Sequence, residues 1–456
     1  MNFVTLSYAI FLPVVVLLYW LLPRRAGRYF LIVASLVFYG SWNVLYVPGF
    51  AALLVANWAF GLLAVTRPRL AVVSALVLDL GLLAVFKYAD WLIGSSAGVL
   101  ALVLGEAPEW GLLGLVLPLA ISFVTFTMLA YVIDTSRGTR PERDLGRFAL
   151  FVTFFPHLIA GPIMRGYEFL PQVRHPRPLA LVHFRLALPL LVGGFAKKVL
   201  GDNLAPSVNA VFADPGAFAT PFIWIGILAF AFQIFLDFSG YTDIALGSAH
   251  LLGFRLPRNF NWPYRATSIQ DFWRRWHMTL SRWLRDYLYF PLGGSRHGKA
   301  RTYLALLLTM LLGGLWHGAG FTFLVWGLLH GAGLAVHRWW RRDRPNPWPI
   351  PPSLAWMLTF GFVLVGWVFF RADSMADALS LLLRAVTFDP SGQQLPLAIT
   401  VLCGVLLAGQ WPGWAALFTK LAPAGSARRY LAYGIAVAAA VMLMPVRTVS
   451  FIYFQF

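Results

Sequence analysis

Apolar stretches that are long enough to cross a membrane recur along this chain, from Leu6 almost to Phe456. A helix needs about 20 mainly apolar residues to cross the hydrocarbon core of a bilayer. We therefore predict about eleven spans, with 184–205 forming either one span or a pair of half-spans. The predicted ranges are 6–22, 29–47, 50–66, 70–93, 112–133, 184–205, 219–250, 302–318, 320–338, 354–371, 396–418 and 429–446.

The composition agrees with a membrane environment. Hydrophobic residues make up 59% of the 456 residues and charged residues only 12%, and this mixture cannot cover a water-soluble surface. The predicted fold class is all-α: a polytopic transmembrane helical protein with about 11 spans plus re-entrant and interfacial helices. We expect residues 1–456 to form a single integral membrane domain.

The basic residues predict how the spans are oriented. The formal net charge of +18 could suggest a nucleic-acid partner, but Lys and Arg lie at the ends of apolar runs and not in a nucleic-acid-reading motif, so we expect none. Clustered Lys and Arg mark cytoplasmic loops, which places 255–301 inside and both termini outside. The loop with Glu106 and Glu109 falls outside, and the first span is retained because no positive region precedes it. The arginines of the first half that fall inside are Arg24, Arg25, Arg28, Arg67, Arg69, Arg137, Arg140, Arg143 and Arg147.

Residues 148–164 form an apolar segment that is interrupted by Pro156, Gly161 and Pro162. Irregular backbone is tolerated at membrane depth only where it is buried in protein or lines a cavity. We therefore predict that this segment is re-entrant or half-inserted.

The stretch 265–290 has the pattern of one interfacial helix. At roughly 100° per residue, one sector collects Asp271 and the arginines, and the opposite sector collects aromatic and aliphatic residues together with His277. Cations toward water and headgroups, with aromatics toward the acyl chains, are typical of such helices. A helix that only anchors the fold would explain the arginines, but it explains an inward-facing histidine less well. The arginines are Arg274, Arg275, Arg282 and Arg285, and the apolar residues are Trp276, Leu280, Trp283, Leu284, Tyr287 and Leu288.

His317 is the main candidate for chemistry. It ends an apolar run and is flanked by Gly313, Gly314, Gly318 and Gly320, and ionisable residues inside a membrane are costly and often functional. Burial disfavours the charged imidazole, and a neutral imidazole is the form that a general base needs. The alternative is a packing histidine that is satisfied by a neighbouring helix.

Other polar residues in apolar runs are weaker candidates. Nothing around His330 distinguishes it from a packing histidine, and Asp237 and Asp243 are expected to pair with local arginines or to orient a histidine. The single cysteine, Cys403, excludes an intrachain disulfide framework and a cysteine-rich metal site. We predict no metal site.

Several blocks of the sequence resemble the membrane-bound O-acyltransferase family, and within it the bacterial branch with the alginate O-acetylation and teichoic acid D-alanylation membrane proteins. The blocks follow the order of the family and cover nearly the whole chain. They are 154–165, 196–205, 235–247, 259–294 and 313–331, and the last six residues, FIYFQF, also resemble the polysaccharide-acetylating members.

The resemblance implies a fold, a site and a reaction. The family's WHG histidine falls on His317 and the histidine of its RRWH block on His277. The family fold implies tilted helices around a thinned centre, with a tunnel in which donor and acceptor meet. It also implies the bacterial inner membrane, an acyl donor on the cytoplasmic side, and modification of an exported or cell-envelope polysaccharide, with a periplasmic or extracellular acyltransferase as partner.

We therefore expect an O-acyltransferase that transfers acetyl from acetyl-CoA or an acyl-carrier thioester, with no tightly bound cofactor. His317 would act as general base, and His277 or nearby backbone amides would position groups or stabilise the oxyanion. The arginines of 265–290 would attract the anionic donor. Two alternatives stay open: a transporter of acyl groups or small anions, and a non-catalytic scaffold of a polysaccharide-modification complex.

Overall fold

The computed structural model describes residues 3, 5–105, 110–176, 178–344, 348–411, 413–445 and 451–452. Glu106, Glu109 and both chain ends therefore lie outside the described residues, as does most of the terminal FIYFQF motif. The described residues contain one isolated bridge, between Phe218 and Gln393, and no strand.

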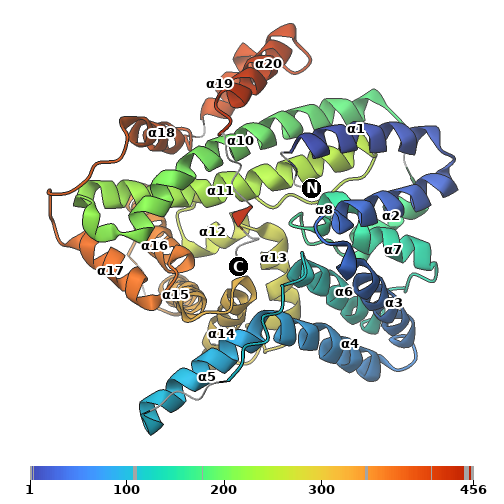
Figure 1. Ribbon diagram of the computed structural model, residues 1–456, viewed down its shortest axis with the longest axis horizontal. Helices are drawn as coiled ribbons and strands as arrows, with labels where there is room; N and C mark the ends of the chain where they lie inside the picture. Colours follow the sequence, from blue (N-terminus) through green and yellow to red (C-terminus); the bar gives the residue numbers. More distant parts are fainter. Residues whose placement is uncertain are drawn as a thin grey trace. The chain divides into compact units, whose positions relative to one another are not determined.

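Helices account for the secondary structure of the described residues (Figure 1). The α-helices are α1 (Leu6–Leu21), α2 (Arg24–Gly40), α3 (Val47–Leu63), α4 (Pro68–Leu83), α5 (Ala89–Leu104), α6 (Ile121–Ser136), α7 (Leu145–Thr153), α8 (Phe155–Leu158), α9 (Gly166–Arg174), α10 (Leu181–Ala213), α11 (Thr220–Leu251), α12 (Ile269–Arg275), α13 (Met278–Leu284), α14 (Lys299–His317), α15 (Phe321–Arg338), α16 (Pro352–Arg371), α17 (Met375–Val386), α18 (Leu397–Ala408), α19 (Gly413–Leu421) and α20 (Ala427–Met442).

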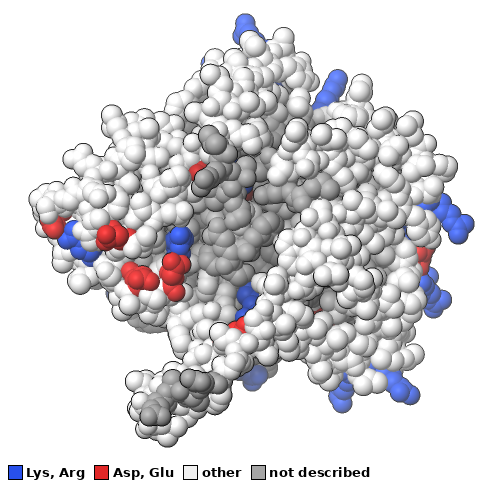
Figure 2. Space-filling view, viewed as in Figure 1, with Lys and Arg blue, Asp and Glu red and all other residues white. Residues whose placement is uncertain are grey.

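The prediction of an all-α membrane protein with several spans is confirmed. Large apolar side chains are exposed along the helices, among them Leu45, Val77 and Leu102, as expected for side chains that face lipid. Figure 2 shows a face on which charged side chains are sparse. The count of about eleven spans stays a prediction. Among the described residues, four helical segments are long and apolar enough to cross a membrane, namely Val44–Leu63, Pro68–Leu104, Thr220–Leu251 and Pro352–Arg371. Shorter apolar helices are Leu6–Leu21, Ile121–Ser136 and Leu397–Ala408.

The chain divides into two compact units. Unit 1 consists of Met1–Leu188 with Ala245–Pro257, and unit 2 of Pro189–Ile244 with Arg258–Phe456. The expectation of a single domain over 1–456 stays a prediction.

In unit 1, α3 and α4 pack against α6, and α7 packs against α2 and α9. A buried hydrogen bond of 2.9 Å, from Nδ2 of Asn57 to Oδ1 of Asp79, joins α3 to α4. The predicted interruption of 148–164 is observed, because α7 ends at Thr153 and only the short α8 precedes a non-helical stretch. Every residue from 150 to 166 is buried, which is the condition for irregular backbone at membrane depth.

In unit 2, α14 and α15 form a closely packed pair, and α15 also packs against α16. Glycines make this approach possible. A Cβ atom on Gly314 would lie 2.2 Å from the carbonyl oxygen of Phe323, and one on Gly327 would lie 2.5 Å from that of Met310. Small residues at a helix interface let two backbones come this close, so these glycines have a packing role.

The prediction of one continuous helix over 265–290 is wrong. Helix α12 ends at Arg275, α13 starts at Met278, and His277 between them has φ 39° and ψ 55°. The non-helical segment 259–261 forms backbone hydrogen bonds at this junction: Asn261 N donates to Arg275 O and Met278 N donates to Asn259 O, both over 2.9 Å. A helical wheel shows only which residues share a face of a helix. It cannot show that another segment of the chain forms the backbone hydrogen bonds that would otherwise continue the helix.

Another predicted span is interrupted. The range 396–418 is divided between α18 and α19, since the helix ends after Ala408. The range 184–205 lies within one long helix, α10, which contains Pro189 and Pro206, so the first of the two predicted forms, one continuous segment, is observed.

Candidate functional site

His317 is the last residue of α14 and is buried. Its ring packs edge to face against three aromatic rings, with centroid distances of 4.9 Å to Trp316, 5.0 Å to Trp326 and 5.1 Å to Phe370. Aromatic faces and edges hold a ring in a defined orientation. The imidazole therefore lies among aromatic side chains in the interior of unit 2, where it is shielded from water.

The turn after His317 leaves no space for a side chain at position 318. The helix ends there because Gly318 has extended backbone angles, with φ −163° and ψ 153°. A Cβ atom on Gly318 would lie 2.1 Å from the ring of Phe323. Glycine at this position therefore lets α15 start close beside the histidine.

His277 is completely buried, and its backbone is in the left-handed region. Few residues other than glycine adopt such angles, and buried examples cluster at functional sites. Its ring packs edge to face against Phe238, at 4.8 Å, and Trp316, at 6.0 Å. Burial lowers the pKa of His277 from 6.5 to about 3, so the ring is neutral at ordinary pH.

The structure brings the two predicted histidines together around Trp316, which both of them contact edge to face. They are 40 positions apart in the sequence, one at the junction of α12 and α13 and the other at the end of α14. Two imidazoles next to one indole can accept or donate protons from two directions. Their catalytic roles stay a prediction.

A third buried histidine belongs to the same cluster. His330 of α15 accepts a hydrogen bond at Nδ1 from Nε1 of Trp273, over 3.3 Å, and its ring lies 4.6 Å from that of Trp326. Trp326 in turn contacts His317. The sequence reasoning set His330 aside, although the glycines on either side of it, as around His317, were a usable signal.

A pocket of about 580 Å³ opens in unit 2 next to this cluster. Its wall includes Trp273, Leu284 and Met310, and Trp273 also contacts Trp326. Two aromatic side chains in contact, Trp273 and Trp326, therefore connect the wall of the pocket to His317. The basic residues that line it are Arg285, His337, Arg338, Arg341 and Arg342.

Of the four arginines predicted for the donor, only Arg285 lines this pocket among the described residues. Arg275 forms an ion pair of 2.9 Å with Asp271 and donates to the carbonyl oxygen of Asn261, which gives it a structural role. Arg274 is exposed, and Arg282 is partly buried. Arg338, Arg341 and Arg342 line the pocket but were not among the arginines predicted from the sequence.

The acidic residues of α11 pair with lysines, so the expectation of arginine partners is wrong. Lys198 of α10 forms buried ion pairs with Asp202, at 2.5 Å, and Asp237, at 2.8 Å. Lys197 pairs with Asp243 at 2.6 Å. The lysines reach these carboxylates because α10 lies close against α11, where a Cβ atom on Gly194 of α10 would lie 2.6 Å from the carbonyl oxygen of Gly240 in α11.

Asp237 also contacts residue 452, because its Oδ2 accepts a hydrogen bond from Ile452 N over 2.8 Å. Phe451 stacks on Tyr241 at 4.5 Å and contacts Phe238, which in turn contacts His277. The described part of the terminal motif thus packs beside the histidine cluster. In the described ranges, no group of three His, Cys, Asp or Glu residues could hold a metal ion.

A membrane protein with buried histidines at a glycine-lined helix end is consistent with an acyltransferase, and sequence comparison establishes the class. The model of the membrane-bound O-acyltransferase family matches residues 144–376. The chain is 44% identical, over 80% of its length and 74% of the relative, to the probable alginate O-acetylase of Azotobacter vinelandii. It is 39% identical, over 82% of its length and 77% of the relative, to the peptidoglycan O-acetyltransferase of Helicobacter pylori.

More distant similarity reaches the teichoic acid D-alanyltransferase of Streptococcus thermophilus, at 29% identity over 50% of this chain and 58% of the relative. The chain belongs to the membrane-bound O-acyltransferase family. The predicted enzyme class, an O-acyltransferase, is confirmed.

Proposed function

We propose that this enzyme transfers an acetyl group from a cytoplasmic thioester toward hydroxyls of an exported or cell-envelope polysaccharide. The observation that carries the proposal is the contact of His277 and His317 with one tryptophan, next to an arginine-lined pocket. The curated relatives support an acetyl group and a glycan acceptor, since they are named for the O-acetylation of alginate and of peptidoglycan.

The pocket is the proposed donor site. Arg285, Arg338, Arg341 and Arg342 would bind the phosphates of acetyl-CoA or of an acyl-carrier arm, because guanidinium groups match phosphate geometry. The apolar wall at Leu284 and Met310 would receive the thioester end. The predicted inner location of the basic segments would put this opening on the cytoplasmic side of the bacterial inner membrane. No tightly bound cofactor is needed for this chemistry.

In the proposed reaction, His317 takes the proton of the attacking hydroxyl as the oxygen bonds to the thioester carbonyl carbon. The carbon–sulfur bond then breaks, and the thiolate leaves with the proton from the imidazolium. His277 would position the reacting groups or stabilise the oxyanion. The aromatic surroundings of His317 exclude water and so limit hydrolysis of the thioester.

The immediate acceptor of the acyl group and the final polymer are separate parts of the proposal. A periplasmic or extracellular acyltransferase would complete transfer to the polysaccharide, so that a serine of this partner, or a lipid, would receive the acetyl group first. Both termini of the enzyme would then lie outside, as the arginine distribution predicts.

The test compares His317→Gln with wild type, because glutamine retains most of the packing volume but cannot act as the base. We expect membrane vesicles that contain the enzyme, its partner acyltransferase and the exported polymer to transfer label from acetyl-CoA about 10²-fold to 10⁴-fold more slowly with the variant than with wild type. His175→Gln, which changes an exposed histidine, is the matched control. Retention of most activity by His317→Gln at equal membrane abundance would contradict the proposal and favour a transporter or scaffold.

A further inference from the structure

A second pocket, of about 380 Å³, lies in unit 1 and is lined by five arginines. Arg24, Arg25 and Arg28 come from the first turns of α2, Arg147 from α7 and Arg174 from the end of α9. Neither His317 nor any residue of the donor pocket belongs to this unit. The acyl-transfer chemistry therefore does not account for the second pocket.

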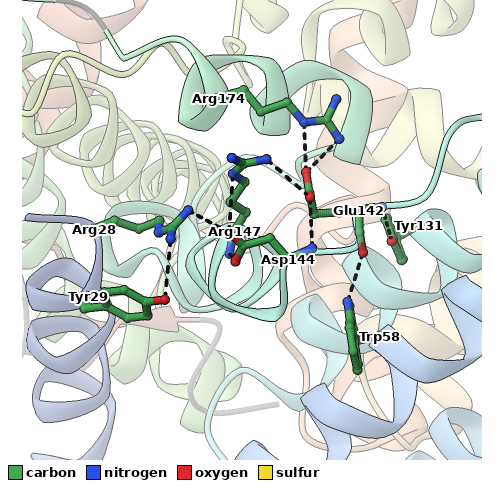
Figure 3. Close-up of polar contacts among 8 residues, drawn as sticks. All are labelled: Arg28, Tyr29, Trp58, Tyr131, Glu142, Asp144, Arg147 and Arg174. Atoms are coloured by element: carbon green, nitrogen blue, oxygen red, sulfur yellow. Dashed lines mark hydrogen bonds and ion pairs between the residues drawn. The ribbon is translucent and has the colours of Figure 1, made fainter. Parts of the chain in front are cut away.

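Two carboxylates hold three of these arginines in place, as Figure 3 shows. Nε and Nη2 of Arg174 donate to Oε2 of the buried Glu142, over 2.9 and 2.6 Å. Arg28 Nη1 lies 3.0 Å from Oδ2 of Asp144, and Arg147 lies 3.7 Å from Glu142 and 3.6 Å from Asp144. These ion pairs preorganise the guanidinium groups at one wall of the pocket.

The carboxylates do not balance the positive charge. Five guanidinium groups face two carboxylates, and Arg24 and Arg25 form no ion pair within the described part of the chain. Arginine cannot lose its proton in a protein. A pocket with this surplus of fixed positive charge has to take its counter-charge from an anion.

The surroundings indicate which anion fits. The backbone N–H groups at the start of α2, next to Arg24 and Arg25, add the positive end of a helix of 17 residues. Tyr19, Leu31 and Phe254 give the pocket an apolar side. Basic pockets between helices at the cytoplasmic surface suit lipid headgroups, and the predicted topology places these arginines at that surface.

We propose that this pocket binds the phosphate of an anionic phospholipid of the inner leaflet. Its guanidinium groups would hold the phosphate, and the apolar side would contact the glycerol and the upper acyl chains. A lipid bound there would link α2, α7 and α9. The inference is independent of the proposed acetyl transfer, because neither its site nor its test involves the donor pocket.

The test measures thermal unfolding and lipid retention of the purified full-length protein in detergent, with added phosphatidylglycerol or phosphatidylcholine. Arg24→Gln with Arg25→Gln removes the unpaired charges and leaves the ion pairs intact. Arg67→Gln with Arg69→Gln is the matched control, because it removes two exposed arginines of the same unit that do not line the pocket. We expect phosphatidylglycerol to stabilise wild type and the control, and its apparent affinity to fall about fivefold for each pocket arginine removed.

Three results would overturn the inference. The first is equal stabilisation of wild type by both lipids, and the second is an equal loss of affinity in the two double variants. The third result concerns the stabilisation of wild type by glycerol 1-phosphate, which is tested without lipid. If it stabilises wild type as well as phosphatidylglycerol does at the same concentration, the ligand is a soluble phosphate and the lipid assignment is wrong.

Discussion

The indole Nε1 of Trp273 donates a hydrogen bond to Nδ1 of His330, over 3.3 Å in the interior of unit 2. Because Nδ1 accepts, the ring carries its proton on Nε2. This bond fixes the side chain that forms the inner wall of the 580 Å³ pocket. His330 is therefore placed to position the wall between the donor pocket and His317.

The first prediction follows from this bond. His330→Leu leaves the indole N–H buried without its acceptor, which costs about 1–3 kcal/mol, and lets Trp273 shift. We expect the KM for acetyl-CoA to rise severalfold while kcat stays within about twofold, since His317 itself is retained. Steady-state kinetics measures both constants.

Two further variants separate positioning from general damage. His330→Asn keeps an acceptor and should restore much of the KM. Trp273→Phe removes the donor, so adding it to His330→Leu should cost less than the sum of the single changes. Additive effects would show that the bond has no part in donor binding.

The second prediction distinguishes the arginines of the pocket from those chosen on the sequence pattern. Arg341→Gln with Arg342→Gln should raise the KM for the donor about 30-fold, at roughly 1 kcal/mol or fivefold per charge near the surface, with little change in kcat. The effect should shrink at high salt, because exposed charges are screened over about 8 Å at physiological ionic strength. Arg274→Gln is the control, and a larger effect of this variant would restore the original assignment.

The third prediction concerns acid sensitivity at His277. Burial lowers the pKa of its folded form to about 3, below the usual 6.5, so the unfolded chain binds the proton first as pH falls. The contribution of His277 to the free energy of unfolding is therefore fully present above pH 6.5. It is lost as the pH falls from 6.5 toward 3, by up to about 1.4 kcal/mol per pH unit. His277→Asn, which tolerates the left-handed backbone, should unfold with a shallower pH dependence over this range.

The same variant tests the catalytic expectation at neutral pH. If His277 serves the reaction, His277→Asn should lower turnover at saturating donor although the protein stays folded. Unchanged turnover together with the shallower pH dependence would make His277 a packing residue.

The fourth prediction concerns the buried ion pairs of α10 and α11. Lys198→Met leaves Asp202 and Asp237 buried without their cation, and breaking such a pair costs about 3–5 kcal/mol. Lys197→Met is the matched control, because its pair with Asp243 is partly exposed and should be worth about 1 kcal/mol or less. Thermal unfolding in detergent compares the two, and equal losses would show that burial does not distinguish them.

Much of the fold could be predicted because a membrane-spanning helix needs a continuous apolar stretch of about 20 residues, and such a stretch is visible in the sequence. The length and the apolar composition of 219–250 predict a helix, and α11 covers nearly the same residues. The interruption at Pro156 and Gly161 was likewise visible, since both residues disfavour a regular helix. The division of 396–418 was missed, although Gly409, Pro412 and Gly413 are of the same two residue types and lie between α18 and the body of α19.

The sequence by itself determined the membrane class, the position of His317 at a glycine-flanked helix end and the segments that carry the arginines. Each of these depends on neighbours in the chain, whose spacing is known. Only the tertiary structure decided that His277 breaks the 265–290 helix, that Trp316 brings it next to His317, and that His330 joins the cluster through Trp273 and Trp326. These contacts depend on which helices pack together, and one sequence contains no distances between residues that are far apart along it.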